Sequence, residues 1–482
     1  MATRRGWIEG AKRSTGLDGA IAFTLAARLL QILSSVGTAL LLIRFLSPVE
    51  QGYYYALLSL AALQTVFELG FSFVILQLAA HETVHLTICA DGSIEGDPRA
   101  HARLASVLQL TVRWYARAAV LMTVLLLPLG ILFFARSGRT EPPVSWHGPW
   151  IAAVLAVSGS FALTPLYSFL EGCRQVRPVA RLRMVQALTV LVLSWSAMAS
   201  HHGLYACALV NLGVIAAGLV FLAWRRRFLL SLLRYPAGAD AVSWRTEVWP
   251  FQWKIAATWL CSYFTLQIFT PILFAVRGPQ EAGRMGLSLS IAGYLPILAL
   301  CWISTKAAPF GQLIRLGRFG ELDAAFFPAL RQSLALMLLL AAACFAAVAG
   351  AQHLLPAIAI RMEPPAIFAL LLLAAAGSFV VQSLAVYLRS FKREPYLIQS
   401  LAVSGCTLTA ALWLAPRWGS AAVAFVYFAF SGVMGTVWAV AIFHSRRRSR
   451  LKSPEVTTMS LQFNAAPAAG AIGRPAMETE AQ

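Results

Sequence analysis

The chain has 482 residues, of which 59% are hydrophobic and only 12% are charged. This composition lies far outside the range of soluble globular domains, so it excludes a soluble protein and indicates an integral membrane protein. A formal net charge of +19 would suggest nucleic-acid binding in a soluble chain. In a membrane protein the same charge is explained by basic loops on one side, so we expect no nucleic-acid partner.

About twelve apolar stretches are long enough to cross a hydrocarbon core about 30 Å thick, which takes roughly 20 helical residues. They are apolar on every face, which favours helices over membrane strands. In the first half the predicted spans are residues 20–43, 52–78, 116–135, 149–170, 182–199 and 204–224. In the second half they are residues 251–276, 285–304, 333–350, 366–388, 396–414 and 421–443. The sequence therefore predicts an all-α membrane protein with two six-helix bundles, residues 20–224 and 251–443.

Basic residues are concentrated in the loops of one side, which is cytoplasmic by the positive-inside rule. The clusters lie at residues 4–13, 174–183, 225–234, 306–318, 389–393 and 446–450. Both termini are then cytoplasmic, with residues 1–19 as an N-terminal segment and residues 225–250 as a linker. Residues 444–482 have little to bury and are predicted to be a disordered, basic tail.

The loops argue against an enzyme. No outer loop exceeds about fifteen residues, near the ordinary length of connections. Among the longer cytoplasmic loops, residues 81–115 contain Asp-Gly and Asp-Pro turns and are predicted to be solvated, with residues 102–117 as a helix on the membrane surface. The cysteines are scattered and no Gly-Lys-Ser/Thr nucleotide loop is present. We expect neither a cofactor nor a metal.

A short motif occurs twice and divides the chain into two copies of one unit. Ser47-Pro-Val-Glu-Gln-Gly52 reappears 231 residues later as Gly278-Pro-Gln-Glu-Ala-Gly283, each time between two apolar stretches. The match continues into the following span, where leucine, serine and alanine recur at the same offset. A duplicated membrane bundle is the usual architecture of a transporter, with its substrate site between the halves.

Arg28 and Glu68 are charged residues well inside predicted spans, where an ionised side chain is costly unless it is paired or faces water. Arg28 lies about two turns into the first span and Glu68 lies within the second. Each is twenty residues from Pro48, so an antiparallel hairpin would bring them to similar depth. They form either a structural ion pair or part of a functional site. Their equivalents in the second half are Trp259 and Ala299, so the duplicated fold does not itself require the pair.

Lys254 opens the seventh span and Lys306 closes the eighth. Both side chains can extend to lipid headgroups. If they point inward instead, they form with Arg28 a cationic cluster suited to a phosphate or diphosphate. Neutral polar residues inside the spans serve either contacts between helices or sugar hydroxyls, and the candidates for the cavity are Gln31, Gln64 and Gln267.

Several segments together resemble a known family. The stretch Leu42-Ile-Arg-Phe-Leu-Ser-Pro-Val-Glu-Gln-Gly-Tyr53, the motif Phe67-Glu-Leu-Gly70 and the stretch Trp249-Pro-Phe-Gln-Trp-Lys254 are similar to those of the oligosaccharide flippases. This group belongs to the multidrug/oligosaccharidyl-lipid/polysaccharide exporter superfamily. The resemblance covers nearly the whole chain except the tail.

The resemblance implies two six-helix bundles around a cavity that opens alternately to the two sides. It also implies transport of a polyprenyl-diphosphate-linked oligosaccharide, a precursor of lipopolysaccharide O-antigen or exopolysaccharide, across the bacterial inner membrane. Basic residues on the first helices of each half often line such cavities, which Arg28 and Lys254 match. Membrane lipids and polysaccharide polymerase and ligase proteins are the partners implied. A cation-coupled multidrug exporter and a non-transporting scaffold of a biosynthetic complex remain alternatives.

Overall fold

The computed structural model of the chain describes most of the two bundles. It covers residues 30, 34, 37–88, 93–138, 143–236, 241–244, 248–304, 306, 309–310, 313–314, 316–391 and 395–451. Within these ranges eight helices are long and apolar enough to cross a membrane, and a bent helix pair raises the number to nine. The prediction of an all-α membrane protein is confirmed. Most of the first predicted span, residues 20–43, lies outside the described residues.

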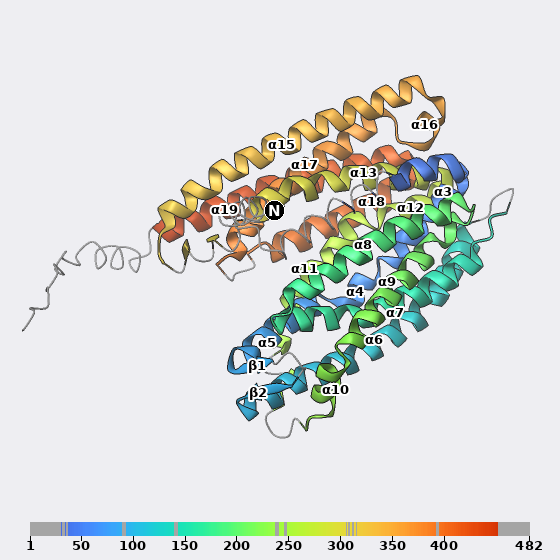
Figure 1. Cartoon of the computed structure of the whole chain (residues 1–482). Helices are drawn as coiled ribbons and strands as arrows, with labels where there is room; N and C mark the ends of the chain where they lie inside the picture. The colour runs from blue at the N-terminus through green and yellow to red at the C-terminus, as the bar shows by residue number, and fades with distance from the viewer. Residues whose placement is uncertain are drawn as a thin grey trace, which may run out of the picture.

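The first half forms one lobe (Figure 1). Residues 37–45 are helical. The elements that follow are α3 (Pro48–Ala61), α4 (Gln64–Glu68), α5 (Phe71–Glu82), η1 (Thr83–His85), β1 (Leu86–Ile88), β2 (Ile94–Gly96), α6 (Pro98–Ser137), α7 (His147–Gly172), α8 (Val176–Ala199), η2 (Gly203–Tyr205), α9 (Ala206–Trp224) and α10 (Arg226–Arg234). Strands β1 and β2 pair antiparallel with Leu86 opposite Gly96. This hairpin lies within the loop predicted to be solvated.

The second half forms the other lobe. Its elements are α11 (Trp249–Leu266), α12 (Phe269–Arg277), α13 (Pro279–Ser304), α15 (Phe319–Leu354), α16 (Pro356–Arg361), α17 (Pro365–Arg389), α18 (Leu397–Val426), the π-helix η5 (Tyr427–Met434) and α19 (Gly435–Leu451). The two lobes approach one another at the end that carries α3 and α16, and diverge toward the end that carries β1, β2 and α10 (Figure 1). We call these the closed end and the divergent end.

The repeated motif forms the contact between the lobes at the closed end. Helices α3 and α13 each begin at the repeated proline, Pro48 or Pro279, where proline's missing N–H removes no helical hydrogen bond. The two helices pack against each other. A Cβ atom on Gly52 would lie 1.9 Å from the carbonyl oxygen of Pro279, so only glycine permits this approach. The duplicated helices thus meet at equivalent positions.

Two predicted spans are broken in the middle. The span predicted at residues 52–78 bends by 40° between α3–α4 and α5–η1, because Leu69 and Gly70 are both left-handed. The seventh span is interrupted between α11 and α12 at Gln267. Pro271 lies four residues later, has no N–H for the Gln267 carbonyl, and therefore favours a break at this point.

The chain reverses direction between the last two predicted spans. Helices α18, η5 and α19 follow without a gap, but Gly419 has φ +60° and ψ −139°, which is not helical. Gln399 donates to the carbonyl of Gly435 and Tyr396 to that of Ala439. These contacts require an antiparallel hairpin with its turn at Gly419. The prediction of two separate spans at residues 396–414 and 421–443 is therefore confirmed.

The prediction of a separate surface helix before the third span is wrong, because helix α6 is continuous there. It is continuous over 40 residues, about 60 Å long, so residues 102–117 are not a separate helix on the membrane surface. The buried face of its first half is covered by α10 and by the linker between the bundles. Gln109 donates to the C-terminal carbonyls of α10, and the Ser106 hydroxyl accepts from the N–H of Val242 at 3.0 Å. The linker is thus packed on the first lobe.

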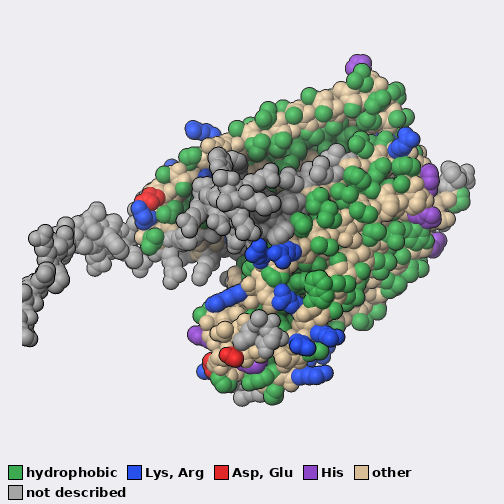
Figure 2. All heavy atoms as spheres, viewed as in Figure 1, with side chains coloured by type: hydrophobic (Ala, Val, Ile, Leu, Met, Phe, Trp, Pro, Cys, Tyr) green, Lys and Arg blue, Asp and Glu red, His purple; other side chains and the backbone are tan. Residues whose placement is uncertain are grey.

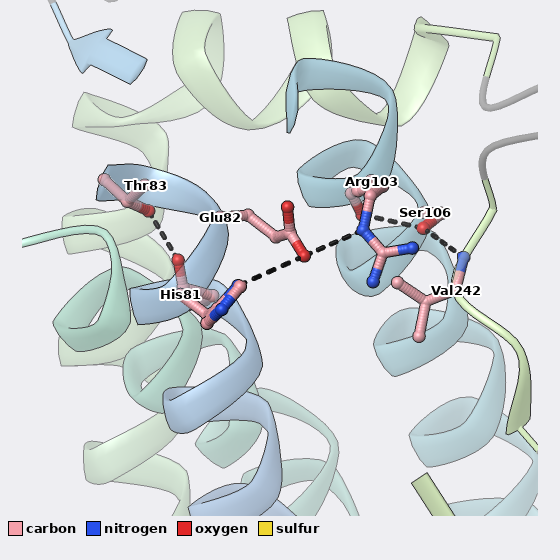
Figure 3. A network of polar contacts seen from close by, with 7 residues as sticks. His81, Glu82, Thr83, Arg103, Ser106 and Val242 are labelled. Atoms are coloured by element: carbon pink, nitrogen blue, oxygen red, sulfur yellow. Dashed lines mark hydrogen bonds and ion pairs between the residues drawn. The ribbon is translucent and has the colours of Figure 1, made fainter. Parts of the chain in front are cut away.

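An ion pair stabilises the divergent end of the first lobe (Figure 3). Glu82, at the end of α5, is buried and accepts from Arg103 Nε of α6 at 2.8 Å. His81 Nδ1 lies 3.7 Å from the same carboxylate. The second lobe has a corresponding pair, in which Arg447 of α19 donates to Asp323 of α15 at 2.8–2.9 Å. Helix α19 runs to Leu451, so the segment after residue 443 begins as helix rather than as a disordered tail.

Candidate functional site

A cavity of about 440 Å³ lies where the two lobes meet. It is bounded by the first helix, α3, α8 and α9 of the first lobe and by α13 and α15 of the second. Most of its wall is apolar, with hydroxyl and amide groups at intervals. The polar and aromatic lining residues among those described are Ser34, Thr38, Tyr54, Tyr55, Ser194, Cys207, Asn211, Ser290, Tyr294 and Cys344. This list includes no charged side chain.

Tyrosines supply the aromatic part of the wall. Tyr54 and Tyr55 follow the repeated motif on α3, and their rings meet edge to face with centroids 5.2 Å apart. Tyr294 lies on α13, close to both. Tyr55 packs against Gly286, its own repeat equivalent, where a Cβ atom would lie 2.5 Å from the tyrosine. The close packing of the two repeated helices therefore also positions the aromatic wall.

Asn211 on α9 is held by its own lobe. Its side-chain oxygen accepts from the Ser160 hydroxyl at 2.7 Å, and its amide donates to the Cys207 carbonyl at 2.8 Å. This half-buried amide, fixed in this way, presents its remaining hydrogen-bonding capacity in one direction. The cavity wall can therefore donate and accept hydrogen bonds while remaining electrically neutral.

The residues predicted as a cationic site are only partly described. Arg28 and Gln31 lie outside the described residues. Lys254 lies on α11, but the position of its side chain is not described. Lys306 follows α13, is half-buried, and its backbone N–H donates to the Ile303 carbonyl at 3.0 Å. The proposed cluster of Arg28, Lys254 and Lys306 thus stays a prediction.

Glu68 lies at the bend of the second span. It is the last residue of α4, is half-buried, and its carboxyl group lies beside the hydroxyl of Ser72 on α5. That hydroxyl also lies 3.1 Å from the hydroxyl of Tyr115 on α6. Helix α4 packs on α11 of the other lobe, so the carboxylate belongs to a segment at the interface between the lobes.

The two described glutamines predicted for the cavity do not line it. Gln64 is the first residue of α4 and is half-buried, whereas Gln267 is exposed at the break between α11 and α12. Neither residue, nor Glu68 or Lys306, is among the lining residues of the central cavity. The tyrosines of the wall were not predicted from the sequence, although the run Tyr53–Tyr55 beside the repeated motif is an available signal.

The closed end is held by polar contacts that the sequence does not predict. Gln51 of α3 donates to the carbonyls of Gly283 and Arg361 in the second lobe, each at 2.9 Å. The Arg361 guanidinium donates to the Leu46 carbonyl of the first lobe. These bonds join residues more than 230 positions apart in the chain. They occur at the repeated motif, which is the only sequence signal that pointed to this region.

Positive charge gathers at the divergent end. Lys and Arg side chains lie around β1, β2 and α10 and along the inner side of the first lobe, while the closed end shows few of them (Figure 2). Arg226, Arg227 and Arg234 of α10 are exposed there. These are among the loop charges from which the sequence predicts a cytoplasmic side, and the orientation of this end stays a prediction.

Comparisons with known proteins show similarity in structure alone. No protein-family model matches the chain, and no curated protein sequence matches it. Among solved structures, an inward-facing multidrug resistance MATE family transporter of the MOP superfamily aligns with a TM-score of 0.55 and 12% identity, covering 88% of this chain and 95% of that one. The lipid II flippase MurJ in an inward closed conformation aligns with a TM-score of 0.53 and 14% identity, covering 92% and 90%.

A third structure is a MOP superfamily transporter from Pyrococcus furiosus, with a TM-score of 0.52 and 13% identity over 92% of this chain and 96% of that one. It is described as having a binding pocket of reversed polarity that suggests a different function. The chain therefore has the fold of the MOP superfamily transporters, two helical lobes with a cavity between them. At these identities the likeness establishes the fold and leaves the substrate open.

Proposed function

We propose that the protein is a flippase that moves a polyprenyl-diphosphate-linked oligosaccharide across the bacterial inner membrane by alternating access. The observation that carries the proposal is the neutral cavity between the lobes, lined by tyrosines, hydroxyls and an amide. Aromatic rings pack on the apolar faces of sugars, while hydroxyl and amide groups exchange hydrogen bonds with sugar hydroxyls. The glycan is a precursor of lipopolysaccharide O-antigen or of an exopolysaccharide, passed on to polymerase and ligase proteins.

The basic residues have a separate role in this proposal. Arg28, Lys254 and Lys306 attract the diphosphate on the cytoplasmic side, because a diphosphate carries more negative charge than any neutral wall can stabilise. Glu68 neutralises Arg28 or exchanges a proton to reset the cycle. The position of Glu68 at a bend that faces the other lobe supports this role, since a bend at the interface is a natural place for movement.

A multidrug exporter is the second candidate, because MATE transporters share the fold. Cationic drugs require a nearby carboxylate or a negative potential. The described residues that line the central cavity include no carboxylate, and the chain carries a net charge of +19. These two facts favour the glycan over a cation. A non-transporting scaffold is the third candidate and would tolerate replacement of the internal charges.

Transbilayer movement of a labelled polyprenyl-diphosphate oligosaccharide in proteoliposomes tests the proposal. The native protein is compared with Arg28→Ala and Glu68→Gln at matched incorporation, with Arg318→Ala as a control in an exposed ion pair. We expect movement by the native protein and the control, strong loss in Arg28→Ala and altered pH dependence in Glu68→Gln. Movement of a cationic dye but not of the glycan would instead support the exporter. Absence of both with folded protein would support the scaffold.

A further inference from the structure

A short strap, residues 361–364 between α16 and α17, bridges the lobes at the closed end. Its first residue faces the first lobe, where the Arg361 guanidinium donates to the Leu46 carbonyl and lies 3.4 Å from the Gln51 side-chain oxygen. The amide of Gln51 in turn donates to the Arg361 carbonyl at 2.9 Å. Separation of the lobes at this end must break these contacts and uncover the strap.

Glu363, two residues further along the strap, faces the second lobe and is only 1% exposed. Its backbone N–H donates to the Ser288 hydroxyl at 3.1 Å, and its carbonyl accepts from Gln352 at 2.8 Å. One carboxyl oxygen accepts from the Ser420 hydroxyl at 2.9 Å. The other oxygen, Oε1, is buried and has no hydrogen-bond partner among the described residues. An ionised carboxylate is poorly stabilised in such a place.

Two charged groups of the second lobe, Glu281 and Arg284, act on this carboxyl without forming an ion pair with it. Glu281 of α13 accepts from the backbone N–H of Ser420 instead, and Arg284 lies on the same helix one turn further along. No ion pair within 4.0 Å joins Glu363 to a described base. Burial raises the pKa of Glu363 to about 7. Glu281 acts in the same direction, whereas the Ser420 hydrogen bond and Arg284 act against it.

The remaining charges at the closed end have their own contacts. Arg277 of α12 donates to the Arg417 carbonyl at 2.6 Å. In the first lobe, Glu50 accepts from the backbone N–H of Ser47 at 2.8 Å in a capping box at the start of α3. The histidines His201 and His202 line a separate surface cleft that includes Glu50. Glu50 therefore provides a control carboxyl at the same end for comparison with Glu363.

We propose that Glu363 is a proton-binding site that controls the contact between the lobes at the closed end. The neutral, protonated carboxyl is favoured in the buried position. When the lobes separate, the strap loses its contacts with Leu46 and Gln51 and can move away from the second lobe, so that water reaches and stabilises the carboxylate. A proton that binds better to the closed conformation must shift the equilibrium toward it. Low pH then holds this end closed, and high pH favours its opening. The inference rests on the proposed function, because it takes the opening of this end to be a step of transport.

Distances between spin labels at the closed end, measured against pH in proteoliposomes without glycan, test this site. One label replaces His202 in the first lobe and the other replaces His353 in the second; both positions are exposed. Native cysteines are replaced by serine. We expect one short distance at pH 5.5 and a growing longer one with a midpoint near pH 7. In Glu363→Gln the short distance persists at every pH, whereas Glu50→Gln keeps the transition.

Ser420→Ala supplies a second readout if Glu363→Gln does not fold. It leaves the carboxyl in place but removes the side-chain hydrogen bond to its ionised form, so ionisation destabilises the closed conformation further and the longer distance should be more populated at pH 8 than in the native protein. Distances that do not change with pH, or a transition that is unaltered in Glu363→Gln or in Ser420→Ala, would overturn the proposal. Because no substrate is present, failure to move the glycan would count against the proposed function and leave this test intact.

Discussion

Gly52 and Gly283, which occupy the same position in the two halves of the chain, lie against one another across the interface between the lobes. A Cβ atom on Gly283 would lie 2.8 Å from the backbone nitrogen of Gly52. Two copies of one helix thus use one small residue to approach each other closely, as membrane helices often do. The contact explains why the glycine of the motif is present in both copies.

Gly52→Ala is predicted to destabilise the closed conformation. Its methyl group would meet the Pro279 carbonyl, so α3 and α13 must move apart, at a cost of about 1–3 kcal/mol. Thermal unfolding in detergent should show a lower midpoint. Gly293→Ala is the matched control, because it lies on α13 with open space around it and alanine favours a helix. Equal midpoints for the two variants would refute the close approach.

Gly419→Ala should weaken the hairpin formed by the last two spans. The backbone at φ +60° and ψ −139° is almost restricted to glycine, and a methyl group would meet the carboxylate of Glu281. We expect a loss of about 1–3 kcal/mol in the free energy of unfolding. Gly405→Ala lies in the same helix with nothing near its Cβ position and should be neutral or slightly stabilising. A comparison of their unfolding midpoints checks the difference.

Arg103→Ala is predicted to destabilise the divergent end of the first lobe. It removes the guanidinium from Glu82, whose side chain is 7% exposed, and leaves only His81 at 3.7 Å, which should cost about 2–3 kcal/mol. Arg318→Ala breaks a pair whose side chains are 58% and 54% exposed and should cost less than about 1 kcal/mol. Denaturant or thermal unfolding of both variants tests the prediction. It is contradicted if the exposed pair contributes as much as the buried one.

Glu363→Gln should change stability in a pH-dependent way. The pKa of this carboxyl is about 7 in the folded protein against an ordinary 4.5, so the folded state binds more protons between these values. The extra proton binding by the folded state stabilises it fully below pH 4.5, and this stabilisation is lost as the pH rises through 7. The free energy of unfolding of the variant should therefore exceed that of the native protein by up to about 3 kcal/mol at pH 8 and by little at pH 4.5. Unfolding midpoints of the two proteins at both pH values measure this difference. A difference between variant and native protein that is the same at both pH values would contradict the prediction.

The sequence predicts the helical class, the duplication and most spans, because these depend on apolar runs and on one repeated motif. Local breaks were harder to predict. The bend at Leu69 puts a leucine in the left-handed region, which no propensity favours. The break at Gln267, by contrast, has a local signal in Pro271. The length of α6 was missed because the polar composition of its first half resembles a surface helix until α10 covers it.

The candidate site was predicted less well than the fold. Charged residues inside spans are conspicuous in a sequence, which is why Arg28 and Glu68 are predicted as site residues. The described part of the cavity wall consists of neutral groups, such as Tyr54 and Asn211, which resemble ordinary core residues until the two halves are placed together. The strap at Arg361 contacts residues about 310 positions away, and no local pattern indicates such a contact.

The packing of the linker on the first lobe limits how far the two lobes can travel. Trp244 stacks on Trp114 of α6 with ring centroids 4.8 Å apart, and α11 begins only five residues later, at Trp249. Five residues of fully extended chain reach at most about 18 Å. The start of α11 is therefore tethered to the first lobe, and any wider separation at the divergent end must occur on the side away from this tether. We therefore expect the lobes to separate unequally at this end, and least where α11 begins.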